Sequence, residues 1–310
     1  MPGFITHLIG GHSALESVSP AIRDYIAPMK ALFNLGTQGP DIFFYYISGF
    51  ITKRIRNVGA QMHDADIGLF FMSIADKMKE TQSPSQRKML FAYTTGFLSH
   101  YAVDAHTHPY VFFQTNDPPS LALKEAERHR HFETSVDVLM LRNIYGKRPS
   151  DYKLGQLISP DCLQKRAAAA AMAEAIRKIY NRDIRPQDVY RAMGQMARYE
   201  GYMQSKTGRR KRWIGRLEHM VIKARVISAL IHMQEVTDNR DYFNVRKAPW
   251  ASPWAKNDIR RESFVELFDA AAANAAQMIE ALFNYMHGKL SREELAATIK
   301  NRSLKTGLHT

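Results

Sequence analysis

The chain has 310 residues, of which 45% are hydrophobic, and it carries a formal net charge of +13 at pH 7. Its single cysteine, Cys162, excludes an internal disulfide bond and a cysteine-based zinc site, and no apolar run approaches the roughly 20 residues that cross a bilayer. Residues 1–7 show neither the basic nor the sustained apolar region of a signal peptide, so we expect a cytoplasmic protein without a transmembrane segment.

Helical patterns dominate the chain. In chain order, apolar periodicity and capping signals predict helices over residues 65–80, 84 to about 104, 122–142, 162 to about 180, 186 to about 203, 213–235 and 261–286, with a last short helix after Ser291. Pro109 is expected to stop the second of these helices, and loops are expected at 35–41, 113–120 and 237–258. Period-two apolar runs are lacking, so strands are few or absent. We expect an all-α fold forming a single domain over residues 1–310.

Histidine is concentrated in the first part of the chain, where eight of the 12 histidines lie within residues 1–131. His100 and His108 flank Asp104 at steps of four residues, and His129 and Glu133 repeat that step. Side chains four residues apart lie on one face of a helix, and imidazole with carboxylate is the ligand set of zinc and of harder metals. We therefore expect two helix faces that bind metal.

Further candidate ligands lie earlier in the chain. The rigid Gly39-Pro40 turn can aim the carboxylate of Asp41 inward, and His63 precedes the helix expected over 65–80. Zinc ions a few ångströms apart would activate water and clamp phosphoryl oxygens during hydrolysis. Eight ligands suffice for two or three such ions if one carboxylate bridges two of them. The candidate ligands are His7, Asp41, His63, His100, Asp104, His108, His129 and Glu133.

Two of these positions have competitors in the sequence. His12 competes with His7, and His106 would replace His108 if the helix breaks before Pro109. In an unbroken helix, His106 and His131 face away from the candidate ligands, because each lies two residues from one of them.

The order and spacing of these residues resemble the zinc-dependent phospholipase C family, whose fold is shared with the S1/P1 nucleases. The motif pieces are Thr6-His7-Leu8-Ile9, Gly39-Pro40-Asp41, His63, His100-Tyr101-Ala102-Val103-Asp104, His108 and His129-x-x-x-Glu133. The first piece favours His7 over His12. The resemblance implies a compact all-α domain whose metal cleft comes mainly from residues 7–133, while residues 134–310 supply further helices.

The resemblance also implies roles for the candidate residues and a phospholipid substrate. His63, His100 and Asp104 would bind the first zinc, with Asp41 as its additional ligand or as the general base. A second zinc would be bound by His108, His129 and Glu133, and Asp104 would bridge to a third zinc at His7.

The third site departs from the family pattern. In secreted members the amine and carbonyl of an N-terminal tryptophan also bind this zinc, whereas this chain reads Met1-Pro2-Gly3 and has no tryptophan near His7. We therefore expect the third site to be weaker, to hold another metal or to be absent.

Three alternatives remain open from the sequence. An HD-type metal phosphohydrolase would use His63-Asp64 with His100 and Asp104, and would require Asp64 as a ligand. A nuclease of the S1/P1 type would use the same cleft as a phospholipase. A non-enzymatic helical protein with structural zinc is disfavoured by the absence of cysteine ligands and the abundance of hard ones.

The basic block Lys206–Trp213 is the densest concentration of positive charge in the chain. It is typical of a solvated helix start, but it would also suit peripheral contact with an anionic membrane or with nucleic acid.

Overall fold

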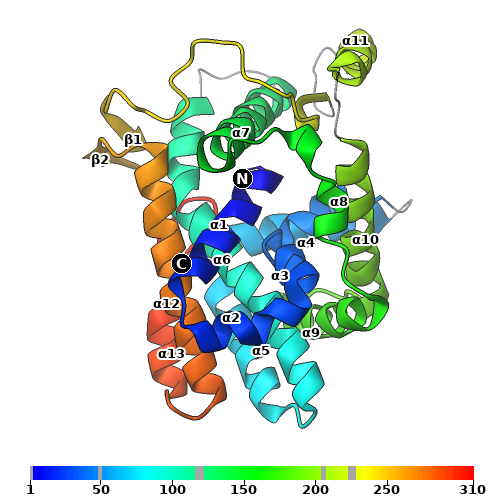
Figure 1. Ribbon diagram of the computed structural model, residues 1–310, viewed down its shortest axis with the longest axis vertical. Helices are drawn as coiled ribbons and strands as arrows, with labels where there is room; N and C mark the ends of the chain where they lie inside the picture. The colour runs from blue at the N-terminus through cyan, green and yellow to red at the C-terminus, as the bar shows by residue number, and fades with distance from the viewer. Residues whose placement is uncertain (1–2, 48–50, 116–121, 204–206, 223–227) are drawn as a thin grey trace.

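The computed structural model describes residues 3–47, 51–115, 122–203, 207–222 and 228–310, and these residues are mainly helical (Figure 1). The α-helices are α1 (Phe4–Ser17), α2 (Pro20–Ile26), α3 (Lys30–Gly36), α4 (Thr52–Asp64), α5 (Ile67–Glu80), α6 (Pro84–Thr115), α7 (Ala122–Tyr145), α8 (Leu154–Leu157), α9 (Cys162–Tyr180), α10 (Pro186–Tyr202), α11 (Arg209–Ile222), α12 (Phe264–Met286) and α13 (Arg292–Ile299). Short 3₁₀ turns are η1 (Ala27–Met29), η2 (Gly39–Tyr45), η4 (Pro149–Asp151) and η5 (Ser228–Leu230).

Strands are confined to one small hairpin in the described part of the chain. Strands β1 (Trp250–Ser252) and β2 (Ala255–Arg260) pair antiparallel, with Trp250 opposite Arg260. The prediction of an all-α fold with few strands is therefore confirmed. No helix of the described residues is long and apolar enough to span a bilayer.

Several predicted helices agree with the structure, and their ends follow the expected chemistry. The carboxylate of Asp161 accepts a hydrogen bond from the amide of Gln164 at 2.8 Å and so caps α9. A capping box between Ser291 and Glu294 opens α13, the short helix predicted after Ser291. Helices α5, α7, α10 and α12 also lie close to the expected ranges.

The prediction that Pro109 ends a helix is wrong, because α6 continues to Thr115. Proline has no N–H to donate to the carbonyl of Ala105, which normally weakens a helix. Here the chain near Gly307 packs against this turn of α6. The approach is so close that a β-carbon added to Gly307 would lie 2.4 Å from the carbonyl oxygen of Ala105. Packing from outside the helix therefore supports a turn that the local sequence disfavours.

Other predicted boundaries also need correction. The loop expected at 35–41 contains the end of α3 and the start of η2, and the helix expected over 213–235 is instead α11 followed by η5. The loop expected at 237–258 contains β1 and part of β2. Of the loop expected at 113–120, residues 116–120 lie outside the described part of the chain. The periodicity also gave no sign of α1 to α4.

Helix α6 runs through the centre of the fold, and apolar side chains on all its faces are buried, as expected for a core helix (Figure 1). It packs closely against α1, α3, α7 and α12. A single cluster of buried apolar side chains extends from Phe4 to Leu304. The single domain over residues 1–310 stays a prediction.

The crossing of α3 and α6 depends on two glycines that let the backbones touch. A β-carbon on Gly36 would lie 2.1 Å from the carbonyl oxygen of Tyr93, and one on Gly96 would lie 2.1 Å from that of Phe33. Both contacts are with backbone, which cannot move aside as a flexible side chain can. His100 follows Gly96 by one helical turn, so this crossing sets where its imidazole lies.

Replacing Gly96 by alanine should therefore destabilise the protein by about 1–3 kcal/mol or more, because α3 must move away from α6. Gly194→Ala is the matched control on α10, where an added β-carbon has only an ordinary contact of 3.6 Å with Lys165 Nζ. That substitution should stabilise the helix by about 0.5–1 kcal/mol. Urea denaturation measures both, and a neutral Gly96→Ala variant would contradict the close crossing.

Candidate metal centre

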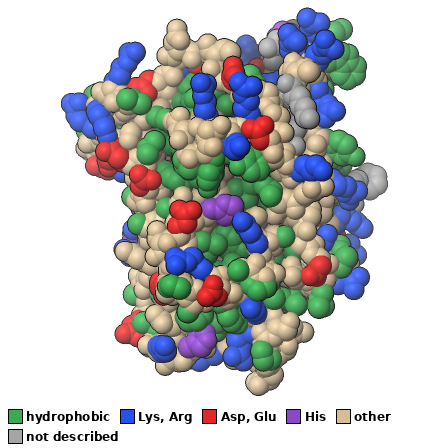
Figure 2. Space-filling view, in the orientation of Figure 1, with side chains coloured by type: hydrophobic (Ala, Val, Ile, Leu, Met, Phe, Trp, Pro, Cys, Tyr) green, Lys and Arg blue, Asp and Glu red, His purple; other side chains and the backbone are tan. Residues whose placement is uncertain are grey.

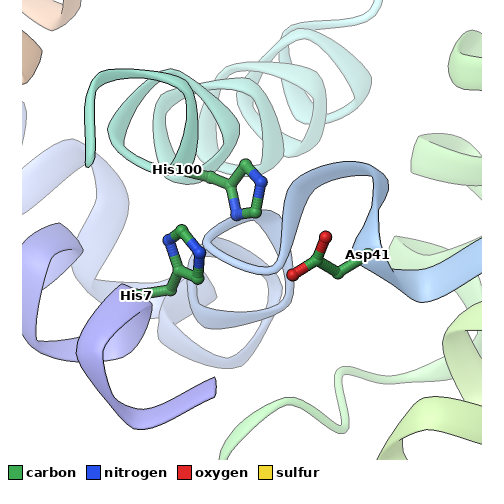
Figure 3. A group of neighbouring side chains, drawn as sticks. All are labelled: His7, Asp41 and His100. Carbon is green, nitrogen blue, oxygen red and sulfur yellow. The ribbon is translucent and has the colours of Figure 1, made fainter. Parts of the chain in front are cut away.

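Five segments that are distant in sequence converge on one buried cluster of imidazoles and carboxylates. Helix α1 contributes His7, η2 contributes Asp41 and α4 contributes His63. The remaining members are His100, Asp104 and His108 from α6, and His129 and Glu133 from α7. Figure 3 shows His7, Asp41 and His100 pointing toward one another from three of these segments.

The carboxylate of Asp104 lies at the centre of this cluster, surrounded by four imidazoles. Oδ1 lies 3.3 Å from Nε2 of His7 and 3.6 Å from Nε2 of His108. Oδ2 lies 3.1 Å from Nε2 of His100 and 3.7 Å from Nε2 of His63. Each carboxylate oxygen thus faces its own pair of histidines, which is the arrangement expected of a carboxylate shared by two metal ions.

Three of the four separations around Asp104 fit metal ligands better than direct hydrogen bonds. Four ligands placed tetrahedrally at zinc, with bonds of 2.0–2.2 Å, lie roughly 3.3 Å from one another. An N–H···O bond would instead bring its two atoms to roughly 2.9 Å. The contacts around Asp104 are all longer than that, and Nε2 of His63 lies 3.2 Å from Oδ1 of Asp41.

The atoms that face one another are also buried without a hydrogen-bond partner among the described residues. They are both oxygens of Asp104, Oδ1 of Asp41 and Nε2 of His7, His63, His100 and His108. Each such atom left without a partner costs about 1–3 kcal/mol. Divalent cations would satisfy all of them, so the residues present fit the metal that this cluster implies.

Hydrogen bonds on the far side of three rings leave Nε2 available for a metal. In each ring Nδ1 is hydrogen-bonded to a backbone carbonyl oxygen. The partners are Gly59 for His63 at 2.7 Å, Thr37 for His100 at 3.1 Å and Leu304 for His108 at 2.6 Å. A carbonyl oxygen can only accept, so Nδ1 must carry the proton and Nε2 keeps its lone pair. Such outer bonds are typical of histidines that ligate metals.

The eight candidates form three groups in which the ligand atoms lie within 4.8 Å of one another. The groups are His7, Asp41 and His100; His63, His100 and Asp104; and His108, His129 and Glu133. The second and third match the first two zinc sites that the family resemblance implied. In the last group Nε2 of His129 lies 2.8 Å from Oε1 of Glu133.

The competing histidines lie elsewhere in the fold. Nε2 of His12 lies 2.9 Å from Oδ1 of Asn34, and Nε2 of His106 lies 3.4 Å from Oδ1 of Asn274. Asp64, which the HD-type alternative requires as a ligand, is exposed and lies 4.0 Å from Nζ of Lys305. None of the three belongs to the groups of ligand atoms in the described chain.

The Gly39-Pro40-Asp41 motif is explained by contact with His100. A β-carbon on Gly39 would lie 2.4 Å from Cδ2 of that imidazole, and Gly39 also has a positive φ of 46°. Only glycine tolerates both conditions without strain. The turn can therefore lie flat against the ring and direct Asp41 toward His63.

The charges in the cluster favour metal binding near neutral pH. Burial alone would raise the pKa of Asp104, but the imidazoles of His108, His100 and His7 hold it well below its usual value. Burial raises the pKa of Glu133 too, yet His129 counteracts this and the pKa falls to about 2. Burial lowers the pKa of His108 well below its usual value. Ionised carboxylates beside a neutral imidazole are the forms that ligate metal.

A cleft of about 490 Å³ gives access to one side of the cluster. Five candidate ligands line it, namely Asp41, His63, His108, His129 and Glu133. It is also lined by Tyr45, Asp64, Asp137, Met196, Glu200, Leu230 and His232. A larger, more open depression of about 880 Å³ lies between α8 and α10 and contains none of the candidate ligands.

A second set of buried polar residues in this cleft was not predicted from the sequence. The carboxylate of Asp137 accepts hydrogen bonds from the amides of Ile5 and Thr6 at 3.1 and 2.7 Å, and lies 2.9 Å from Nε2 of His232. It thereby caps the helix that positions His7. Asp137 follows Glu133 by four residues, so the spacing rule could have found it. His232 is isolated in the sequence and gave no such signal.

A helical protein with a buried cluster of imidazoles and carboxylates beside a cleft has the features of a metal-dependent protein. Residues 6–200, more than half of the chain, match the family model described as zinc dependent phospholipase C, and the chain belongs to that family. Neither a curated protein nor a solved structure matches the chain. The family supports a zinc-dependent hydrolase.

Substituting alanine for Asp137 should destabilise the protein by about 2–4 kcal/mol, because the first amides of α1 and the imidazole of His232 would lose a buried charged partner. Asp269→Ala, at an exposed position of α12, is the matched control and should stay within about 0.5 kcal/mol of the original protein. Chemical denaturation distinguishes the two. Equal stability of both variants would contradict a capping role for Asp137.

Proposed function

We propose that this protein is a zinc-dependent phosphodiesterase that hydrolyses phospholipids, as the family resemblance implies. The observation that carries the proposal is Asp104, whose two buried oxygens each face two imidazoles beside a cleft. Zinc bound there would lower the pKa of a water molecule and stabilise charge on a phosphoryl group. Open positions on the cleft side would distinguish such a site from a closed structural one.

The protein's own residues would act mainly by holding and orienting. His63, His100 and Asp104 would bind one ion, and His108, His129 and Glu133 would bind another. The carbonyls of Gly59, Thr37 and Leu304 would keep three of these rings in one orientation. The Leu304 carbonyl belongs to the C-terminal segment, where Ser303 also donates to the carbonyl of His63 at 3.0 Å.

A third site is proposed at His7, as the resemblance implied. Because the family's N-terminal tryptophan is missing, this site is the weaker one, and the total is two ions when it is empty and three when it is filled. His7 groups with Asp41 and His100, and its Nε2 lies 3.3 Å from Asp104. Its ring also stacks on that of His100, with centroids 3.9 Å apart. Both ring nitrogens of His7 lack a hydrogen-bond partner among the described residues, which supports a ligand role.

Asp41 is the proposed general base. Its carboxylate is buried at the cleft wall, 3.2 Å from Nε2 of His63. From that position it could accept a proton from water attacking a phosphodiester in the cleft.

The lining of the cleft supports an amphiphilic substrate. Phe4, Phe44, Phe112, Met196 and Leu230 contribute apolar surface close to the polar cluster. A phosphodiester that carries acyl chains would place its phosphate at the cluster and its apolar parts on these side chains. We propose phospholipid as the substrate. Hydrolysis of single-stranded DNA is measured beside it, to compare the two substrate classes.

Asp41→Asn should lower kcat for phosphatidylcholine in mixed micelles by roughly 10²-fold or more, because the amide cannot accept the proton. The variant should keep its fold and most of its metal. Asp64→Asn is the matched control, since this exposed carboxylate also lines the cleft but belongs to none of the ligand groups, and its kcat should stay close to that of the original protein.

Two results of this assay would contradict the proposal. Loss of activity in Asp64→Asn with retention in Asp41→Asn would favour the HD-type alternative. Hydrolysis of single-stranded DNA without any hydrolysis of phospholipid would assign the same cleft to a nuclease.

A further inference from the structure

Helix α11 (Arg209–Ile222) exposes an apolar stripe to solvent. Trp213, Leu217 and Met220 are spaced by four and three residues, so they lie on one side of the helix. Their exposed fractions are 64%, 44% and 79%. A surface helix normally turns such a stripe toward the core, so this orientation needs an explanation.

The opposite side of α11 attaches the helix to the rest of the protein. Nζ of Lys211 donates to the carbonyl of Ile231 at 2.8 Å, and Oε2 of Glu218 accepts from the amide of Ser228 at 2.8 Å. At about 100° per residue, these two positions lie roughly 140° around the axis from the apolar stripe. The stripe therefore faces away from the body, and Figure 1 shows α11 projecting at the upper right.

Positive charge flanks the stripe on both sides. Arg209 and Arg216 lie along one edge and Arg210 along the other, with Arg212 further round the first edge. Glu218, the one acidic residue of α11, lies on the attached side. In Figure 2 the Lys and Arg side chains gather with hydrophobic side chains at the upper right, where α11 lies.

We infer that α11 is an interfacial helix that docks the protein on an anionic phospholipid surface. Trp213, Leu217 and Met220 enter the boundary between headgroups and acyl chains, and the flanking arginines contact lipid phosphates. A strongly amphipathic helix with low overall hydropathy, arginines on its polar side and a tryptophan on the other has the composition of helices that lie in this plane.

The expected contact block Lys206–Trp213 is thereby revised. Lys206 lies outside the described residues, and the proposed contact extends instead to Met220 at the other end of α11. The charge alone would suit nucleic acid, but that contact would leave the apolar stripe in water. A symmetric contact with a second copy would bring the flanking arginines of the two copies together. Repulsion between these like charges disfavours such a contact.

The docking helix is bonded to a wall of the cleft. Lys211 and Glu218 hold the segment Ser228–Ile231, whose Leu230 lines the cleft. The carbonyl of Ala229 in that segment accepts from Oγ1 of Thr134 on α7 at 3.1 Å. Docking through α11 would thus hold the cleft at the surface that contains the proposed substrate. The docking itself needs neither metal nor turnover, so it can fail or succeed independently of the proposed function.

Co-sedimentation with vesicles tests this inference. The probe is a vesicle of equal parts phosphatidylcholine and phosphatidylserine, compared with phosphatidylcholine alone. The triple variant Trp213→Ser/Leu217→Ser/Met220→Ser should bind the mixed vesicles at least about tenfold more weakly than the original protein. Leu163→Ser/Val245→Ser/Ile259→Ser, which removes exposed apolar side chains elsewhere, should bind normally. Arg209→Gln/Arg212→Gln/Arg216→Gln should lose the preference for phosphatidylserine.

Tryptophan fluorescence gives an independent readout of insertion. Trp213 is the most exposed of the three tryptophans, since Trp254 is 38% and Trp250 only 2% exposed. Vesicles should shift the emission to the blue, and Trp213→Phe should remove the shift while keeping the binding. Hydrolysis of the soluble phosphodiester bis-p-nitrophenyl phosphate should be unchanged in the serine triple variant, which separates docking from catalysis.

Three outcomes would overturn the inference. The first is unchanged vesicle binding by the serine triple variant while its thermal unfolding is normal. The second is a blue shift that persists in Trp213→Phe. The third is a protein that does not bind vesicles but binds single-stranded DNA, or one that does not bind vesicles but forms a dimer that is lost in the serine triple variant.

Discussion

The arrangement of this protein depends on a single buried carboxylate. Asp104 is inaccessible to solvent and is surrounded by four imidazoles from three helices, at distances of 3.1–3.7 Å. An ionised group so deeply buried requires strong compensation, which divalent cations would provide. The glycine crossing of α3 and α6, the turn at Gly39 and the C-terminal segment all serve to bring partners to this carboxylate.

The sequence predicted the parts of the site that follow from local geometry. His100, Asp104, His108, His129 and Glu133 are spaced by helical turns, so their clustering needed only the period of a helix. His7 and Asp41 could be proposed only through the family resemblance and a turn motif, because long-range packing brings them in. Whether all eight residues ligate metal stays a prediction, although the structure groups them as expected.

The failures have the same physical origin. Pro109 was expected to end α6, but the chain near Gly307 packs on that turn and the helix continues. His232 has no neighbouring motif, and it joins Asp137 only through folding across 95 positions of the chain. Tertiary contacts of this kind have no signature within a short window of sequence, whereas caps and helical faces do.

Metal content provides the most direct test of the central claim. Elemental analysis of the purified protein should find two or three zinc ions per chain, and Asp104→Asn should lose most of them while remaining folded by circular dichroism. His12→Ala and His106→Ala are matched controls, because each removes a histidine that lies outside the cluster, and both should retain the metal. Zinc that is absent from the original protein, or equally retained in Asp104→Asn, would contradict a carboxylate-centred metal site.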